Sequence, residues 1–447
     1  MTDHGRRWGQ CLCAVALLGL SVAWTHAAKP VTTTVYPTGS FPLDMQNVQS
    51  AIDRGGTVIL KATNAAGQPT AFDFGPPDPQ VDGGVNLHTD VSILGEQSGG
   101  HMTTIKGGFN PILGLVPVKS TIQGIHFDGP LDSPIALIRS TGANIIANRI
   151  TGIVPLLLFF GATEIEGIFV SGFDDPENAV TGQINVQGNV IEVSSGDFVN
   201  GMQFDEVSAD IQVSGNSVEF LHSDGAVQTI GILVFRSHGK ATVVQNQVTM
   251  GDGDPNAFPV GIFVGGHAEA SYRISGNTVV TNHPNSDGID VVGFSFSGPT
   301  QQAIVEGNHV VIHSTIPTAG GIAFAGAVQN SLMSANRIEG TSGNAIQILG
   351  IDSSTIAFSN HAVGNDISQL SASFGDVFFG PDSADNLLAG HCNTYIDLGV
   401  GNRILCGSPL AVPANATQSS RRPGPTMSMA DQVRRARLAS TRPRLAR

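Results

Sequence analysis

The string Asn285-Ser286-Asp287-Gly288-Ile289-Asp290 holds the two carboxylates that are best placed to do chemistry in this chain. Inverting cleavage of a glycosidic bond needs one carboxylic acid to protonate the leaving oxygen and a second carboxylate to activate water, with about 6.5–9.5 Å between them. We expect Asp287 and Asp290 to project into one groove and predict them as the catalytic residues. The alternative is structural, because Asp-Gly before a strand is ordinary turn chemistry.

A polysaccharide lyase would need other groups. β-Elimination on a uronate uses an Arg or Lys base and usually Ca²⁺ held by carboxylates on adjacent turns. Arg236 and Lys240 are the basic residues nearest to the corresponding strand, and no motif for Ca²⁺ or another cofactor is present. The histidines, such as His267, His309 and His313, are too scattered for a shared metal ion. The chain also has no Gly-Lys phosphate loop, zinc knuckle or basic-aromatic stripe, so we expect no nucleic-acid partner.

A short strand pattern recurs and would position these side chains: a small residue followed by apolar-x-apolar. It occurs as GIFV from Gly167, GMQF from Gly201, GILV from Gly231, GIFV from Gly261, GIDV from Gly288, GIAF from Gly321, AIQI from Ala345 and DVFF from Asp376. The period is two, so alternate side chains point outward. Because the outward face is partly apolar, it needs either loops over it or a ligand against it. The outward residues that we expect to bind substrate are Phe169, Gln203, Asp205, Phe235, Phe263, Gln347 and Phe378.

A second unit, apolar-x-apolar-x-(Gly/Ala/Gln)-Asn-x-apolar, alternates with the first. Its asparagines are Asn148, Asn189, Asn216, Asn246, Asn277, Asn308 and Asn336, with successive spacings of 41, 27, 30, 31, 31 and 28 residues. We expect each Asn to adopt the left-handed backbone of a sharp corner and to hydrogen-bond to its neighbours along the axis. One repeat cannot bury its own apolar side, so stacked repeats predict an all-β parallel solenoid of about ten rungs, spaced by about 4.8 Å.

Both ends of such a coil need covers, because open rungs expose unpaired edges. Residues 44–53 have the pattern of a short amphipathic helix with Val48 and Ile52 on one face, followed by Gly55-Gly56. This helix is expected to plug the N-terminal opening. Cys392 and Cys406 are the two cysteines outside the leader, and a disulfide between them is expected to close the C-terminal end.

Residues 1–28 have the pattern of a signal peptide. Arg6 and Arg7 precede an apolar run over residues 11–24, and the small residues Ala27 and Ala28 follow. The run is too short to span a membrane. We therefore expect a secreted or periplasmic protein that is not membrane-spanning, and we expect it to be a monomer.

Charge divides the remaining chain in two. Residues 29–410, the predicted β-helix domain, hold 12 Lys+Arg and 34 Asp+Glu, a net charge of −22. This charge disfavours a polyanionic substrate relative to a neutral glycan. Residues 411–447 hold eight Arg and one Asp, and their composition predicts a disordered tail. The tail would bind anionic surface polymers or the acidic body, or it is solvated without a partner.

The run NVQSAIDRGGTVILKA, followed by VSILGE, TTIKGG and IQGIHFDG, resembles the opening of pectin-lyase-like right-handed parallel β-helix proteins. The resemblance continues through the Asn repeats to about residue 407 and implies this fold, with a substrate groove along the outward strand face. The superfamily includes polysaccharide lyases, glycoside hydrolases, epimerases, esterases and non-catalytic adhesive or viral proteins, so it leaves the function open.

The 285–290 string also resembles the Asn-Thr-Asp-Gly-x-Asp segment of polygalacturonase-like glycoside hydrolases, which implies that Asp290 is the general acid. That family has two further Asp residues on the next rung, then a Gly-His-Gly segment and a basic motif. Here the next rungs read GGIAFAGA and NAIQILG, without a carboxylate or a histidine. Two hypotheses follow: an exported protein that binds and cleaves a polysaccharide or cell-surface glycan, or a non-catalytic surface-binding or envelope scaffold.

Overall fold

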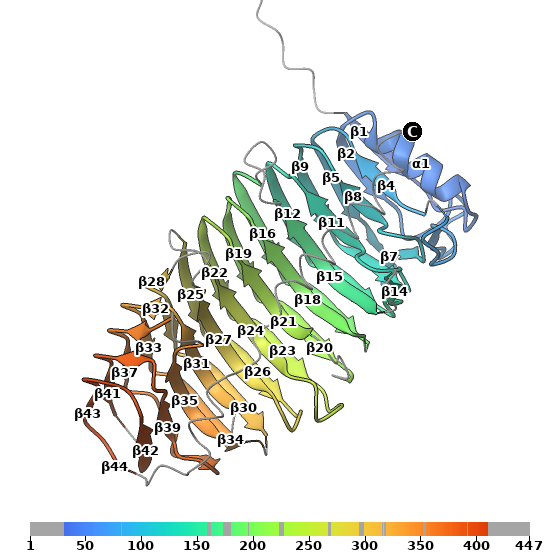
Figure 1. Ribbon diagram of the computed structural model, residues 1–447. Coiled ribbons are helices and arrows are strands. Elements are labelled where there is room, and N and C mark those ends of the chain that lie inside the picture. The colour runs from blue at the N-terminus through green and yellow to red at the C-terminus, as the bar shows by residue number, and fades with distance from the viewer. Residues whose placement is uncertain are drawn as a thin grey trace, which may run out of the picture. The chain divides into compact units, whose positions relative to one another are not determined.

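The computed structural model describes residues 31–409 except 82, 159–161, 173–179, 195, 223–227, 267–269, 295–298, 315, 317–318, 352–354 and 391. These residues belong to one compact unit that begins at Val31. They form a parallel β-helix of about ten turns, as the repeats predicted, and Figure 1 shows the strands stacked turn after turn. The predicted signal peptide, residues 1–28, and the predicted tail, residues 411–447, lie outside the described residues.

Sheet 1 contains the strands that precede the repeated corner asparagines, and its 14 strands pair in parallel in the order of their appearance along the chain. They are β1 (Thr32–Val35), β2 (Gly56–Leu60), β5 (Val91–Gly95), β9 (Lys119–Gln123), β12 (Gly142–Ile146), β16 (Gln183–Gln187), β19 (Asp210–Ser214), β22 (Lys240–Val244), β25 (Ser271–Ser275), β29 (Ile304–Glu306), β33 (Leu332–Ser334), β37 (His361–Val363), β41 (Leu387–Ala389) and β43 (Arg403–Ile404).

Sheet 2 contains the strands that follow these asparagines. They are β3 (Phe72–Asp73), β7 (His101–Lys106), β10 (Ile125–Asp128), β13 (Arg149–Thr151), β17 (Val190–Val193), β20 (Ser217–Phe220), β23 (Gln247–Met250), β26 (Thr278–Thr281), β30 (His309–His313), β34 (Arg337–Ser342) and β38 (Leu370–Ala372), with β6 (Gln97–Ser98) antiparallel to β7.

Sheet 3 contains the strands with the small-residue and apolar-x-apolar pattern, together with further strands towards both ends of the coil. They are β4 (Val85–Leu87), β8 (Ile112–Gly114), β11 (Ile135–Ile138), β15 (Thr163–Ser171), β18 (Phe198–Asp205), β21 (Gln228–Phe235), β24 (Pro259–Gly265), β27 (Asp287–Gly293), β31 (Gly320–Gly326), β35 (Asn344–Leu349), β39 (Val377–Phe379), β42 (Thr394–Asp397) and β44 (Ser408–Pro409), with β14 (Leu156–Leu157) antiparallel to β15.

Sheet 4 is an additional sheet that the repeats did not predict. Its four strands are β28 (Thr300–Gln301), β32 (Val328–Gln329), β36 (Ala357–Phe358) and β40 (Ser383–Ala384), each between a sheet 3 strand and the following sheet 1 strand. In every sheet the alternate apolar side chains point into one continuous core, which extends from Val35 to Leu388. Burial of this apolar surface contributes most of the free energy that stabilises the stacked turns.

The predicted asparagine ladder is present, and Asn365 extends it by one turn. Asn277 shows the pattern: its Nδ2 donates to the Val243 carbonyl (2.9 Å) and to Asn308 Oδ1 (2.9 Å), and its Oδ1 accepts from the Asn246 backbone N–H (2.9 Å) and Nδ2 (3.0 Å). The prediction that these asparagines are themselves left-handed is wrong. The residue before each one takes the positive φ, as Gly276 does at 62°. The asparagine side chain instead satisfies backbone groups that the corner removes from the sheets.

A second ladder lies at the corner between sheets 4 and 1. The backbone N–H groups of Ser331, Asn360 and Asn386 donate to the Oδ1 atoms of Asn360 (3.1 Å), Asn386 (2.8 Å) and Asn402 (3.0 Å) respectively. The residue before Asn360, Ser359, again has a positive φ of 52°. Asparagine side chains therefore also satisfy backbone groups at the corner between sheets 4 and 1.

The predicted N-terminal helix is α1 (Leu43–Ile52), with Val48 and Ile52 buried. Gln49 pairs with the backbone of Asn86 on β4, donating to its carbonyl (3.0 Å) and accepting from its N–H (2.7 Å). The side-chain amide thus takes the place of a neighbouring strand at the first edge of sheet 3. The buried Asp44 carboxylate accepts four backbone N–H groups, three of them from residues 38–40.

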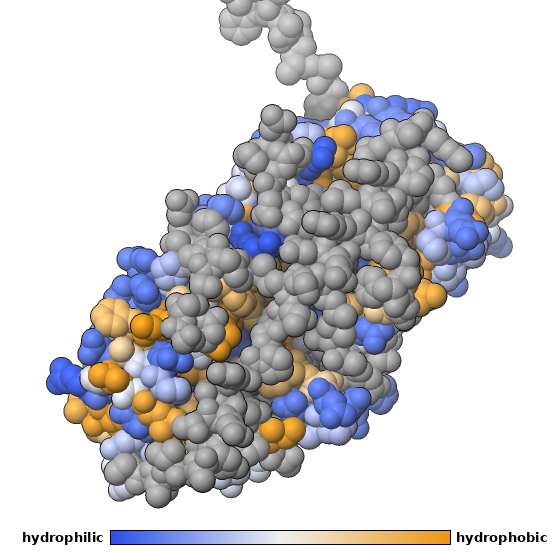
Figure 2. Space-filling view, in the orientation of Figure 1, coloured by the Kyte–Doolittle hydropathy of each residue, from blue (hydrophilic) through white to orange (hydrophobic). Residues whose placement is uncertain are grey.

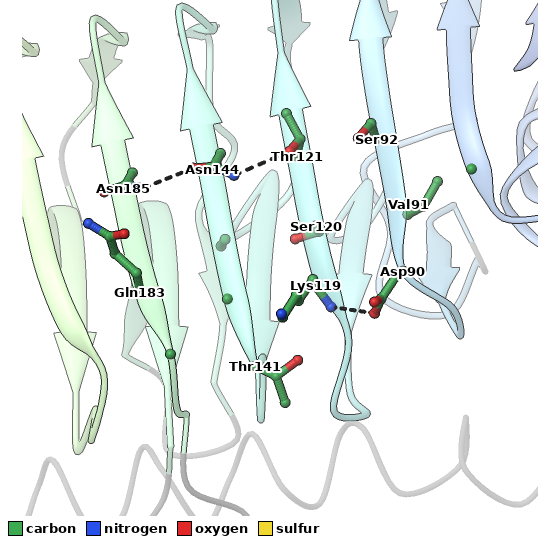
Figure 3. Close-up of a pocket in the computed structure, with 14 residues that line it drawn as sticks. Asp90, Val91, Ser92, Lys119, Ser120, Thr121, Thr141, Asn144, Gln183 and Asn185 are labelled. Carbon is green, nitrogen blue, oxygen red and sulfur yellow. Dashed lines mark hydrogen bonds between the residues drawn. The ribbon is translucent and has the colours of Figure 1, made fainter. Parts of the chain in front are cut away.

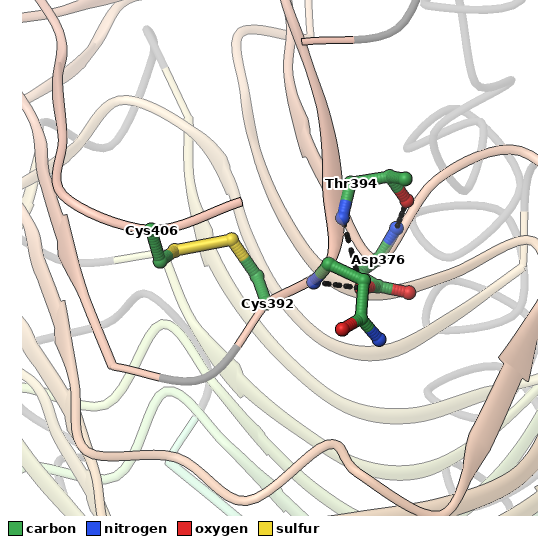
Figure 4. The surroundings of a disulfide bond; sticks show 5 residues. Asp376, Cys392, Thr394 and Cys406 are labelled. Atoms are coloured by element: carbon green, nitrogen blue, oxygen red, sulfur yellow. Dashed lines mark hydrogen bonds between the residues drawn. A yellow bond between two sulfur atoms is a disulfide. The ribbon is translucent and has the colours of Figure 1, made fainter. Parts of the chain in front are cut away.

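The predicted disulfide joins Cys392 and Cys406 at the C-terminal end, with their Cα atoms 5.6 Å apart (Figure 4). Beside it, Asp376 Oδ2 accepts from the backbone N–H groups of Asn393 (2.6 Å) and Thr394 (3.1 Å). These contacts attach the last turns to the coil. Among the described residues, no helix is long and apolar enough to cross a membrane.

Candidate functional site

The strand register of sheet 3 brings most of the predicted site residues into one column on its outer face. Each is paired with the residue at the same position of the next strand, and the column reads Phe169, Gln203, Leu233, Phe263, Asp290, Ala323, Gln347 and Phe378. Asp205 and Phe235 pair in a neighbouring column. Asp287 lies across from Val260 in a third column. The sequence therefore placed these side chains on one shared face.

This face is closed rather than open. Phe169, Phe263, Gln347 and Phe378 are between 3% and 5% exposed, while Gln203, Asp205 and Phe235 are half-buried. Leu233, Phe263, Val292 and Phe294 belong to an apolar cluster outside the main core. The Phe235 ring meets the rings of Phe263 and Phe294 edge-on, with centroids 6.3 and 5.7 Å away. The aromatic residues that we predicted to bind substrate thus pack largely against one another.

The two predicted catalytic carboxylates lie on the outer side of β27, on either side of the core residue Ile289. Both are buried, Asp287 at 0% and Asp290 at 4% exposure, and both have interaction partners. Asp287 Oδ1 accepts the backbone N–H of Gly320 at 2.6 Å, so this carboxylate fixes the start of β31. Asp287 therefore has a structural role in positioning β31.

Two further buried carboxylates on this face were not predicted. Glu164 and Glu166 lie on β15 on either side of the core residue Ile165 and are 3% and 1% exposed. Ser133 Oγ donates to Glu166 Oε2 at 3.1 Å. Counted back in twos from the outward residue Phe169, the alternation would point both glutamates inward. They point outward because the phase shifts by one residue at Gly167, between the core residues Ile165 and Ile168, so the strand pattern gave no signal for them.

The basic groups proposed for a lyase are engaged or distant. Arg236 Nη2 lies 3.5 Å from Asp205 Oδ1 and 2.5 Å from Glu206 Oε1, and its guanidinium carbon is 4.9 Å from the Phe235 ring centroid. A guanidinium held between two carboxylates is a poor proton acceptor. Lys240 opens β22 of sheet 1 and is exposed. The described residues contain no group of three or more His, Cys, Asp or Glu side chains that could hold a metal ion.

An open groove lies instead on the outer face of sheet 1, between β2 and β16, with a volume of about 440 Å³ (Figure 3). Ser92, Thr121, Asn144 and Asn185 face it from four consecutive strands in register. Asn144 Nδ2 donates to Thr121 Oγ1 (3.4 Å) and Asn185 Nδ2 donates to Asn144 Oδ1 (2.9 Å). The result is a row of uncharged hydrogen-bonding groups, one per turn, that runs along the axis.

Few charges border this row. Asp90, Lys119 and Gln183 line one long side of the groove, at or just before the starts of their strands, and Asp90 Oδ1 accepts the backbone N–H of Lys119 at 2.8 Å. The groove can therefore offer many hydrogen bonds to a neutral polar ligand, with one cation and one anion at its margin.

The sequence contained a signal for this groove that we did not use. The groove residues Asn144 and Asn185 each stand four positions before a corner asparagine, and the same position is polar through Arg273. It then becomes apolar at Ile304 and Leu332. Figure 2 shows apolar side chains among polar ones over the C-terminal turns. The polar row is confined to the N-terminal and middle turns.

In sequence, the chain matches no protein-family model and no curated protein. Two solved structures match the chain. The Dettilon tailspike protein (gp208) is 15% identical, with a TM-score of 0.45, and the match covers 84% of this chain and 68% of that one. The Azotobacter vinelandii mannuronan C-5 epimerase AlgE6 A-module is 14% identical, with a TM-score of 0.31 and coverage of 82% and 92% respectively.

Proposed function

We propose that this protein binds a neutral polysaccharide or cell-surface glycan along the groove of sheet 1. The observation that carries the proposal is the row of Ser92, Thr121, Asn144 and Asn185. Hydroxyl and amide side chains both donate and accept hydrogen bonds, as sugar hydroxyls do. One such group per turn, about 4.8 Å apart, offers repeated contacts to an extended chain of sugar rings.

The size and charge of the groove fit the same ligand class. A volume of about 440 Å³ lies within the usual range for ligand sites, and the groove is open, so a longer chain can extend beyond it. The net charge of −22 on residues 29–410 disfavours a polyanionic glycan.

The test is glycan binding by groove variants. Asn144→Ala together with Asn185→Ala removes two amide groups, and each lost hydrogen bond of about 0.5–1.5 kcal/mol weakens binding roughly 2–10-fold. The control is Thr249→Ala, which alters an outward, half-buried polar residue of sheet 2. Affinity for a panel of neutral polysaccharides would be measured by calorimetry. Equal affinity of the double variant and the control would refute the groove as the binding site.

Cleavage at Asp287 and Asp290 is a second candidate function. It is favoured by the position of both carboxylates on the outer side of one strand, beside the aromatic column. Release of sugar or unsaturated product from a broad polysaccharide panel, abolished in Asp290→Asn, would support it. No product from any member of the panel would count decisively against it.

Export is part of the proposal. The Cys392–Cys406 disulfide supports an oxidising compartment, which fits the signal-peptide pattern of residues 1–28. Fractionation of the producing cells tests it: intact protein, with its leader, in the cytoplasm would refute export.

A further inference from the structure

Four carboxylates on the outer face of sheet 3 are buried, although they point away from the core. Glu164, Glu166, Asp287 and Asp290 are at most 4% exposed, and none of them lacks a partner. Buried carboxylates are tolerated only with counter-charges or hydrogen-bond donors, because desolvation of an isolated charge is costly. The outer face of sheet 3 therefore combines buried carboxyl groups, which need such partners, with apolar surface.

Cations for this face are scarce within the coil. Among the described residues, the ion pairs found there share one cation, Arg236, which already meets Asp205 and Glu206. The internal segments between the described ranges contain neither Lys nor Arg. Residues 411–447, in contrast, hold eight Arg and one Asp. The charge of this segment complements that of the face.

Residues 411–447 also leave the coil next to sheet 3. Their nearest described strand is β44 (Ser408–Pro409), the last strand of sheet 3 itself. An extended chain of 37 residues reaches about 120 Å, at about 3.3 Å per residue. Ten turns at about 4.8 Å span about 50 Å. The segment can therefore reach Asp290 and also Glu164 from its point of departure.

We propose that the C-terminal segment, residues 411–447, docks along the outer face of sheet 3 of its own chain. Its arginines pair with the carboxylates of this face, and the apolar residues between them, Met427, Met429 and Val433, cover the aromatic cluster. The segment has the composition of a chain without a fold of its own, so it becomes ordered by binding. The inference is independent of glycan binding in the groove of sheet 1, because that groove lies on another face, whereas a docked segment would exclude cleavage at Asp287 and Asp290.

Carboxyl labelling of the full-length chain tests this docking. A carbodiimide and a small amine modify accessible carboxylates, and peptide mass spectrometry gives the rate at each site. We expect Asp287 and Asp290 to be labelled several-fold faster in the variant Arg434→Gln, Arg435→Gln, Arg437→Gln than in the unaltered chain at low salt. High salt should raise the rate in the unaltered chain, because it screens the pairing.

Two controls make the result specific. Glu219, exposed on sheet 2, should be labelled at the same rate in both proteins. Replacing the three arginines by lysines keeps their charge and should preserve most of the protection. The substitutions lie outside the described coil, and a far-ultraviolet spectrum checks that the coil is folded.

Equal labelling of Asp287 and Asp290 in the unaltered chain and the glutamine variant, at both salt concentrations, would overturn the proposal. So would protection that disappears on dilution, because it would show that the segment of a second copy covers the face.

Discussion

Replacing Asn277 by alanine tests what holds the corners of the coil. The side chain is 1% exposed and makes four hydrogen bonds within its ladder. In Asn277→Ala, the Asn246 backbone N–H loses its acceptor and the Val243 carbonyl loses a donor, both in the buried interior. A buried polar group without its partner costs about 1–3 kcal/mol, so the free energy of unfolding should fall by about 2–6 kcal/mol.

The matched control is Gly276→Ala at the preceding position. Gly276 has a φ of 62°, but an added Cβ would meet only Gln245 Cγ, at 3.7 Å. Alanine already occupies the equivalent left-handed position at Ala147. The control should therefore cost about 1–2 kcal/mol. Urea unfolding followed by far-ultraviolet circular dichroism compares the two, and a loss in Asn277→Ala no larger than in Gly276→Ala would refute the ladder as a stabilising element.

Three further predictions concern the ends, the core and the surface of the coil. Replacing Cys392 and Cys406 by serine opens a loop of 14 residues and should lower the free energy of unfolding by about 3 kcal/mol; an unchanged urea midpoint would contradict this. Gly261→Ala should cost at least about 1–3 kcal/mol, since the new Cβ would lie 2.3 Å from Val279 Cγ1, and a neutral effect in urea would show that the turns can move apart. The hydrogen bond with the His309 imidazole lowers the pKa of Glu339 in the folded protein. The ionised Glu339 carboxylate therefore stabilises the fold above the ordinary carboxyl pKa, and this stabilisation is lost as the pH falls through the lowered pKa. Thermal unfolding of Glu339→Gln should accordingly depend less on pH in the acid range than that of the unaltered chain, and identical pH profiles would argue against this ion pair.

The fold could be predicted because its evidence is local and repeated. The period-two strands at Gly201 and Gly231, and the asparagines that recur about every 30 residues, each describe one turn, and the same turn recurs along the chain. Sheet 4 was not predictable in this way, since strands of two residues, such as β28 and β36, are too short to show a period.

The candidate site was only partly predictable. Alternation placed Phe263, Asp290 and Gln347 on one face, and the register confirms it. Whether that face is open depends on contacts between residues far apart in the chain, such as Phe235 and Phe294, and no strand pattern contains that information. The groove at Asn144 and Asn185 could have been found by comparing the same position in successive turns.

Within each apolar-x-apolar segment, the sequence by itself determined which side chains point inward and which outward, because the pleat of a strand fixes their direction residue by residue. It also determined that turns stack, since no single turn can bury its own apolar side. Only the tertiary structure decided the backbone of the corners, where Gly276 rather than Asn277 is left-handed because the asparagine is held by four hydrogen bonds to neighbouring turns. It also decided which face is open, because burial depends on contacts between residues far apart in the chain.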